Sequence, residues 1–154
     1  MRKYEELASK NSDIDIIETD MLPEFQSGCY VNGAIYIKES IPLYKKHEVL
    51  HEELAHHELT YGNILDQSKY NHRKFENYAR RRAFETACPL SKIINAYYEG
   101  IESLYELAEY LELTEKFLLN ALEYYKQKYG LSVLHNHHLI TFEPLKVYQY
   151  HKVN

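Results

Sequence analysis

The sequence has no tryptophan, only two cysteines and no long apolar run. Cys29 and Cys88 lie in unrelated segments and form no CxxC motif, so free thiols in a reduced cytoplasm are the simplest expectation. The first residues, MRKYEELASKN, lack the apolar stretch of a signal peptide, and no segment approaches the roughly 20 apolar residues of a membrane span. We therefore expect a cytoplasmic protein that neither enters nor spans a membrane.

The chain also has no excess of basic residues. The net charge is −5, so the overall balance does not predict nucleic-acid or membrane binding. Apolar residues make up 45% and charged residues 27% of the 154 positions, which is ordinary for a globular protein. We expect a single domain over residues 1–154.

Histidine and tyrosine are abundant, with nine and sixteen copies. His47, His51, His56 and His57 fall within one short segment, KKHEVLHEELAHHELT, and a second group forms HNHH at residues 135–138. The second group lies where we expect a solvated hairpin turn, which we favour over an extra metal site. The first group needs a chemical explanation.

Residue patterns predict an α+β fold in which a small antiparallel sheet packs against a mostly helical domain. Asn32-Gly33 provides the two positive-φ positions of a type I′ turn in the hairpin GCYVNGAIYIK. The expected helices are 2–10, 42–59, 68–87, 90–98, one capped by Ser103 with Glu106, and one from Thr114 to Gly130. Strands are expected at 14–19, in the hairpin, and in a terminal hairpin that turns near Asn136. Within this single domain we expect three parts: a core at about 1–88, a helical part at 89–130 and the terminal hairpin at 131–154.

Two consecutive five-residue frames on the helix 42–59, residues 47–51 and 52–56, offer metal-binding chemistry. HEVLH at 47–51 matches HExxH, in which two His at i and i+4 bind zinc and the Glu reaches the metal-bound water. Charges at Lys45-Lys46 and Glu52-Glu53 flank this frame, whereas a zinc helix should present apolar residues to the core. We therefore expect His47 and Glu48 to face solvent.

The later frame, Glu52 to His56, has better neighbours. Val49-Leu50 precede it and Leu54-Ala55 fill its interior. Glu52 stands where the first His is expected, and carboxylate oxygen is a legitimate zinc ligand. Without a metal, several charged groups on one buried turn would be costly. The alternative is a solvated helix face rich in His and Glu.

The segment VLHEELAHHELTYGNILDQSKYNHRKFENYARRRAFETACPL resembles the ImmA/IrrE family of metallopeptidases, in its phage and mobile-element branch. LYELAEYLELTEKFLLNALEYYKQKYG and the preceding GCYVNGAIYIKES are similar to the same branch. The resemblance covers about residues 25–147. Its most specific motif is the zinc helix followed by ExxA on the next long helix, here Glu76 to Ala79.

The resemblance implies a minimal metalloprotease domain of the gluzincin type that binds zinc or another divalent metal. Position by position, Glu52, His56 and Glu76 are the implied metal ligands and Glu53 is the implied general base. The residues themselves agree on Glu76, because it shares one helical stripe with Ala79 and Ala83, where small side chains permit close helix packing. Glu85 lies off that stripe and is the weaker candidate for this ligand.

The remaining polar residues have secondary roles in this reading. His57 and His51 are expected either at the surface, beside the ligands, or as alternative ligands. Arg80 and Arg81, with Arg82, form a basic turn that binds either an acidic segment of a partner or neighbouring helix carboxylates. Glu52 beside Glu53 should raise one of their pKa values.

The resemblance implies a bacterial cytoplasmic enzyme that cuts a helix-turn-helix repressor of the same mobile element. The alternative is a catalytically silent antirepressor that binds the repressor without cutting it. A third class, DNA binding through ELAEYLELTEKFL, is disfavoured. Residues 101–130 carry six Glu against three Lys, a net charge of −3, and TEKFLLNALEYYKQ contains no Arg.

Overall fold

The computed structural model describes residues 2–61 and 72–150. Contacts divide the chain into two compact units, 1–83 and 84–154. The boundary falls within helix α3 (His72–Ala87), close to the predicted end of the core at about residue 88. The start of this helix predicted at Ser68 lies outside the described residues. Each unit is described by itself, and the expectation of one domain stays a prediction.

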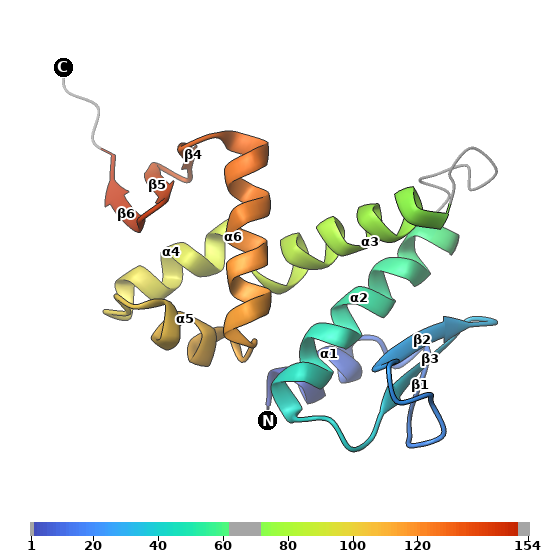
Figure 1. The fold of residues 1–154 in the computed structure, drawn as a ribbon. Coiled ribbons are helices and arrows are strands. Elements are labelled where there is room, and N and C mark those ends of the chain that lie inside the picture. The colour runs from blue at the N-terminus through green and yellow to red at the C-terminus, as the bar shows by residue number, and fades with distance from the viewer. Residues whose placement is uncertain (1, 62–71, 151–154) are drawn as a thin grey trace. The chain divides into compact units, whose positions relative to one another are not determined.

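Unit 1 combines a small sheet with two complete helices and part of a third (Figure 1). Its elements are α1 (Lys3–Lys10), β1 (Asp15–Thr19), β2 (Gly28–Val31), β3 (Ala34–Lys38) and α2 (Leu43–Tyr61), followed by the first part of α3. Tyr4 of α1, Ile35 and Ile37 of β3, and Val49 and Leu50 of α2 form the buried core. The central strand therefore packs its apolar face directly against the helix that carries the His cluster.

The mixed α/β fold is confirmed, with one difference in the first sheet. The strand order is β1-β3-β2, and β1 pairs with β3 in parallel, while β2 and β3 form the predicted antiparallel hairpin. The chain reverses direction between β1 and β2 and again at the Asn32-Gly33 turn, where φ is 51° and 80°. Two reversals restore the direction of β1, so its pairing with the central strand is parallel.

Unit 2 contains α4 (Leu90–Tyr98), α5 (Leu104–Leu111), α6 (Glu115–Tyr129) and a three-stranded antiparallel sheet. The sheet consists of β4 (Ser132–His135), β5 (His138–Phe142) and β6 (Leu145–Gln149), in that order. The predicted caps are confirmed: Ser103 Oγ accepts from Glu106 N at 3.0 Å and Thr114 Oγ1 from Phe117 N at 3.2 Å. The terminal hairpin turns at Asn136-His137, as predicted, and gains β6 as a third strand.

Aromatic and aliphatic residues fill the interior of unit 2. Leu118, Ala121 and Ile140 are fully buried. Tyr125 stacks on Phe142 with ring centroids 5.9 Å apart, and its hydroxyl donates to the Cys88 carbonyl at 2.8 Å. No helix in the described part of the chain is long and apolar enough to cross a membrane.

Candidate metal centre

Helix α2 is enclosed around most of its circumference near its middle. Residues 47–51 are all buried, a run longer than one helical turn, and His47 and Glu48 are only 3% and 1% exposed. The expectation that His47 and Glu48 face solvent is therefore wrong. That expectation assumed that α2 has a single buried face and that a charged residue on its other faces must meet water. In the structure, the negative charge of the buried Glu48 is instead paired with Lys45, whose Nζ lies 3.3 Å from the Glu48 carboxylate.

The earlier frame brings its two histidines together. His47 Nε2 and His51 Nε2 are 3.2 Å apart in a buried pair, with the rings edge to face. One turn of helix separates these residues, which explains their proximity. A hydrogen bond between the two rings accounts for this distance without a metal, provided that one nitrogen carries the proton.

The later frame links α2 to α3. His56 Nε2 lies 3.1 Å from Glu76 Oε2, and the approach depends on small residues beside it. Ala55 and Leu59 of α2 pack with Ala79 of α3, and Ala79 and Ala83 are almost completely buried. The predicted stripe of small residues on α3 is confirmed. It places the Glu76 carboxylate, which is 41% exposed, within reach of the His56 imidazole.

Two neighbouring carboxylates are withdrawn from water on the same helix. Burial, followed by the charges of Glu52 and Glu76, raises the pKa of Glu53 to about 8. Burial also raises the pKa of Glu52, against the opposing effect of Lys45 and Arg80. Burial lowers the pKa of His56 more than Glu76 raises it, which favours the neutral imidazole that a metal ligand requires. Glu52, Glu53, His56 and Glu76 thus share one electrostatic neighbourhood.

Strand β2 contributes a residue that the sequence reading missed. The Tyr30 hydroxyl and His57 Nδ1 share a hydrogen bond of 2.8 Å, and the two rings meet edge to face. His57 is thereby held against the sheet, one residue after His56. The only sequence signal for Tyr30 was its place in the hairpin before α2, which does not identify its partner.

The beginning of β2 packs tightly against the same helix. A Cβ atom on Gly28 would lie 2.5 Å from Val49 Cγ1 and 3.5 Å from Glu53 Cγ. We expect Gly28→Ala to lower the free energy of unfolding by about 1–3 kcal/mol, because the buried, branched Val49 side chain cannot move aside freely. Chemical denaturation measures this change. Adding Val49→Ala should recover part of the loss, and the absence of any recovery would contradict this packing.

The basic turn of α3 divides into two kinds of residue. Arg80 and Arg81 are exposed, whereas Arg82 binds Glu58 of α2 through two contacts of 3.1 Å. Glu85, the weaker ligand candidate, accepts from Tyr124 and Lys128 at 3.1 Å within unit 2. It therefore has a structural role of its own.

The donor set suits a divalent metal in its chemistry. A neutral imidazole nitrogen and carboxylate oxygens are zinc ligands, and a nearby cation would stabilise the carboxylates of the partly buried Glu52 and the buried Glu53. The geometry is less complete: within residues 2–61 and 72–150, no three His, Cys, Asp or Glu side chains converge on one point. The structure therefore brings two of the implied ligands together, His56 and Glu76, and leaves Glu52 as a partly buried neighbour.

Comparison with known proteins bears on this site. The family model of the IrrE N-terminal-like domain, Peptidase_M78, matches residues 9–123, a range that includes α2, α3 and all four implied site residues. No curated protein and no solved structure matches the chain. Since the match extends over most of the sequence, the chain belongs to the IrrE N-terminal-like family of peptidases and has a zinc-metallopeptidase-like fold, as the resemblance predicted.

Proposed function

We propose that the chain is a zinc-dependent endopeptidase that cleaves one protein partner, a helix-turn-helix repressor of the phage or mobile element to which the chain belongs. The contact between His56 Nε2 and Glu76 Oε2, beside the buried Glu53, is the observation that carries this proposal. It joins the two helices from which a gluzincin-type site draws its ligands. Family membership supports peptide hydrolysis as the reaction class.

In the proposed site, Glu52, His56 and Glu76 would hold the metal. When bound, the metal supplies a Lewis acid that polarises the scissile carbonyl and lowers the pKa of a water. Glu53 takes a proton from the attacking water and passes it to the leaving amine. The raised pKa of Glu53, about 8, suits a group that must both accept and return a proton near neutral pH.

Strand β2 offers a place for the substrate backbone. Among the strands that the structure describes, β2 lies at the edge of its sheet. The hydrogen bond from Lys38 N to Ser27 O marks a hydrogen-bonded pair of the β2–β3 ladder, so by alternation Gly28 and Tyr30 direct their backbone groups away from β3. An extended peptide that pairs with this edge would pass Glu53 and His57, which β2 already contacts. The substrate is therefore proposed to bind as an added strand.

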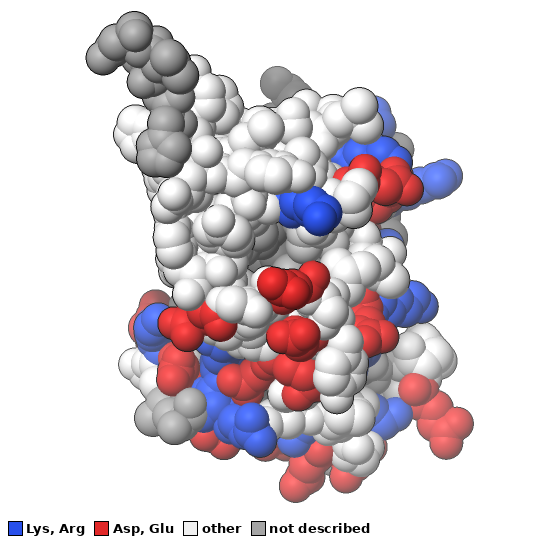
Figure 2. Space-filling view, turned by 90° about the vertical axis from the view of Figure 1, so that its left-hand side faces the viewer, with Lys and Arg blue, Asp and Glu red and all other residues white. Residues whose placement is uncertain are grey.

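The charges favour a protein partner over a nucleic acid. On the face shown in Figure 2, basic side chains are interspersed with acidic ones, and the net charge is −5. The exposed Arg80 and Arg81 are proposed to bind an acidic segment of the repressor. We propose no direct contact with DNA.

A silent antirepressor is the second candidate function. Glu52 in the place of a His, and the absence of three converging ligands in the part of the chain that the structure describes, favour it. Such a protein would bind the repressor and prevent its action without hydrolysis.

A cleavage assay separates these functions. The purified chain is incubated with zinc and the repressor of its mobile element, and products are identified by mass spectrometry. We expect one major cut that requires both the metal and Glu53. A stable complex without any cut supports the silent antirepressor, and neither binding nor cleavage contradicts both proposals.

A further inference from the structure

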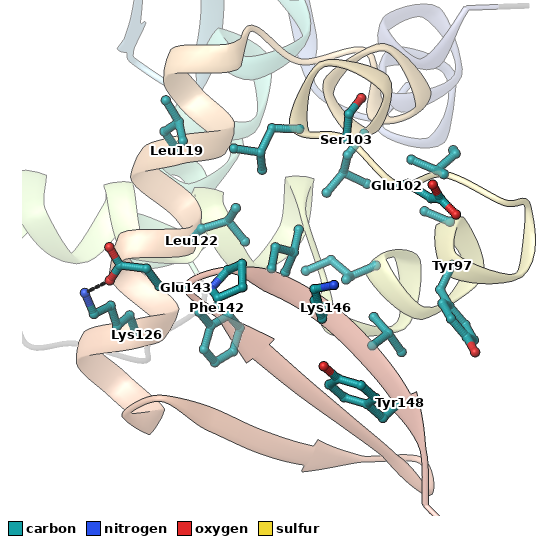
Figure 3. Close-up of a pocket in the computed structure, with 18 of the residues that line it drawn as sticks. Tyr97, Glu102, Ser103, Leu119, Leu122, Lys126, Phe142, Glu143, Lys146 and Tyr148 are labelled. Atoms are coloured by element: carbon teal, nitrogen blue, oxygen red, sulfur yellow. Dashed lines mark hydrogen bonds and ion pairs between the residues drawn. The ribbon is translucent and has the colours of Figure 1, made fainter.

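A large pocket in unit 2 borders the open edge of strand β6. Its volume is about 910 Å³, and its walls come from α4, α5, α6 and the segment that leads into β6. Figure 3 shows side chains of these helices and of β6 around one space, with Leu119 and Leu122 on one side and Tyr148 on another. Leu104, Leu119 and Tyr148 are 39%, 52% and 50% exposed, so an apolar surface is open to solvent here.

Strand β6 forms one wall of the pocket. Four consecutive residues, from Leu145 to Tyr148, line it. Successive side chains of a strand point to opposite faces, so the pocket meets the side chains of alternate residues and the backbone of the residues between them. The backbone of β6 is therefore part of the wall.

The hydrogen bonds of the sheet show which backbone groups are open at that edge. Tyr150 N donates to His137 O at 2.8 Å, and this pair belongs to the β5–β6 register. Because hydrogen-bonded pairs alternate along an antiparallel ladder, Lys146 and Tyr148 direct their backbone groups to β5, while Leu145, Val147 and Gln149 direct theirs outward. In the described part of the chain, no strand pairs with that side of β6.

Charge at the mouth of the pocket adds one further feature. Lys126 and Glu143 form an ion pair, shown by the dashed line in Figure 3. Glu102, Glu123 and Lys146 also line the pocket, and none of the three forms an ion pair within residues 2–61 and 72–150. Acidic charge is in excess among these three residues, so a basic group on the ligand would complement it.

We propose that this groove binds an extended peptide segment of a partner protein, which adds a fourth strand antiparallel or parallel to β6. Its apolar side chains, at alternate positions, occupy the pocket, and a basic residue faces Glu102. Five residues of β6 at about 3.4 Å each provide roughly 17 Å of edge, so a segment of about five residues is recognised. The site is independent of metal and of hydrolysis, and therefore does not depend on the proposed function.

A tryptophan-containing peptide tests this site directly, because the chain itself has no tryptophan. The probe is a capped seven-residue peptide that alternates valine with threonine, has tryptophan at its centre and lysine at one end. On titration with the metal-free full chain, its emission should shift to the blue and its anisotropy should saturate. The same peptide with N-methyl groups on its edge-facing amides should bind at least about tenfold more weakly.

Matched variants locate the binding. Val147→Pro removes an outward N–H without removing a β5–β6 bond and should weaken binding by about tenfold or more. Leu134→Pro is the control and makes the same change on the outer edge of β4. The hydrogen bond from Phe142 N to Leu131 O fixes the alternation of the β4–β5 ladder, so the Leu134 N–H points away from β5. This variant should leave binding unchanged. Circular dichroism verifies that both variants are folded. A side-chain pair covers the case in which either proline variant is unfolded: Leu119→Glu should weaken binding, whereas Leu131→Glu, exposed but outside the pocket, should not.

Three results would overturn the proposal. One is the absence of saturable binding at millimolar peptide, and another is equal binding to wild type and Val147→Pro. The third is self-association of the wild type, measured by sedimentation, that Val147→Pro abolishes while the peptide fails to bind. That result would assign the edge to a second copy of the chain.

Discussion

Glu53→Gln is expected to reduce repressor cleavage by about 100- to 10,000-fold while leaving the metal in place. Glutamine keeps the shape of the side chain but cannot accept the proton of the attacking water. Glu53 is the carboxylate of α2 whose environment is most suited to this exchange, because burial and the neighbouring Glu52 raise its pKa to about 8. Initial rates of product formation by mass spectrometry measure the effect.

Glu48→Gln is the matched control for this change. Glu48 is the equivalent carboxylate of the HEVLH frame, and it is even more deeply buried than Glu53. We expect this variant to cleave at a rate close to that of the wild type, once circular dichroism has shown that it is folded. If Glu48→Gln abolishes cleavage and Glu53→Gln does not, the general base has been assigned to the wrong frame.

Removal of the metal should destabilise the chain substantially. Burial raises the pKa of both Glu52 and Glu53, and the charge of Glu52 adds to the rise at Glu53, so the ionised carboxylates are unfavourable here without a cation. Zinc at 100 times its Kd would stabilise the folded state by about 2.7 kcal/mol. For a chain of this length, that corresponds to a rise in Tm of roughly 5–11 °C.

The difference in Tm between zinc-loaded and chelator-treated protein measures this effect. Because both forms of one variant are compared, any change in Tm that the substitution causes without zinc cancels. We expect the shift to disappear in His56→Ala and Glu76→Ala. It should persist in His47→Ala, even though loss of this buried ring lowers the Tm of both forms. An equal shift in wild type and His56→Ala would mean that zinc acts elsewhere on the chain.

Local backbone rules predicted much of the fold. The Asn32-Gly33 turn, the Ser103 and Thr114 caps and the turn near Asn136 depend on a few adjacent residues, and each is present in the structure. The parallel pairing of β1 was not predictable in the same way. It depends on which neighbour a distant segment selects in the sheet, and the alternation IDIIET has no signal for that choice.

Burial around α2 shows where pattern reasoning reaches its limit. The charges next to His47 suggested solvent, because a charged residue is costly in a core unless it is paired. The structure places Lys45 3.3 Å from Glu48, a pair three residues apart that lowers this cost within the helix itself. A pattern of residue types cannot reveal such compensation until the helix is placed among its neighbours.

The site itself was predictable only in part. Glu76 followed from the small-residue stripe that it shares with Ala79 and Ala83, and the structure brings its carboxylate to His56. Tyr30 was not predictable, because its hydrogen bond to His57 joins residues 27 positions apart on different elements. That Glu52 does not converge with His56 and Glu76 in the described part of the chain was not predictable either, because no residue pattern specifies side-chain positions.

Metal content per chain, by elemental analysis after zinc loading and gel filtration, tests the metal assignment most directly. Wild type, His47→Ala, His56→Ala and Glu76→Ala are compared in parallel. We predict about one zinc per chain in the wild type and in His47→Ala, and a loss of bound zinc in the other two variants. Zinc retained by His56→Ala and lost from His47→Ala would contradict the account and move the metal centre to the HEVLH frame.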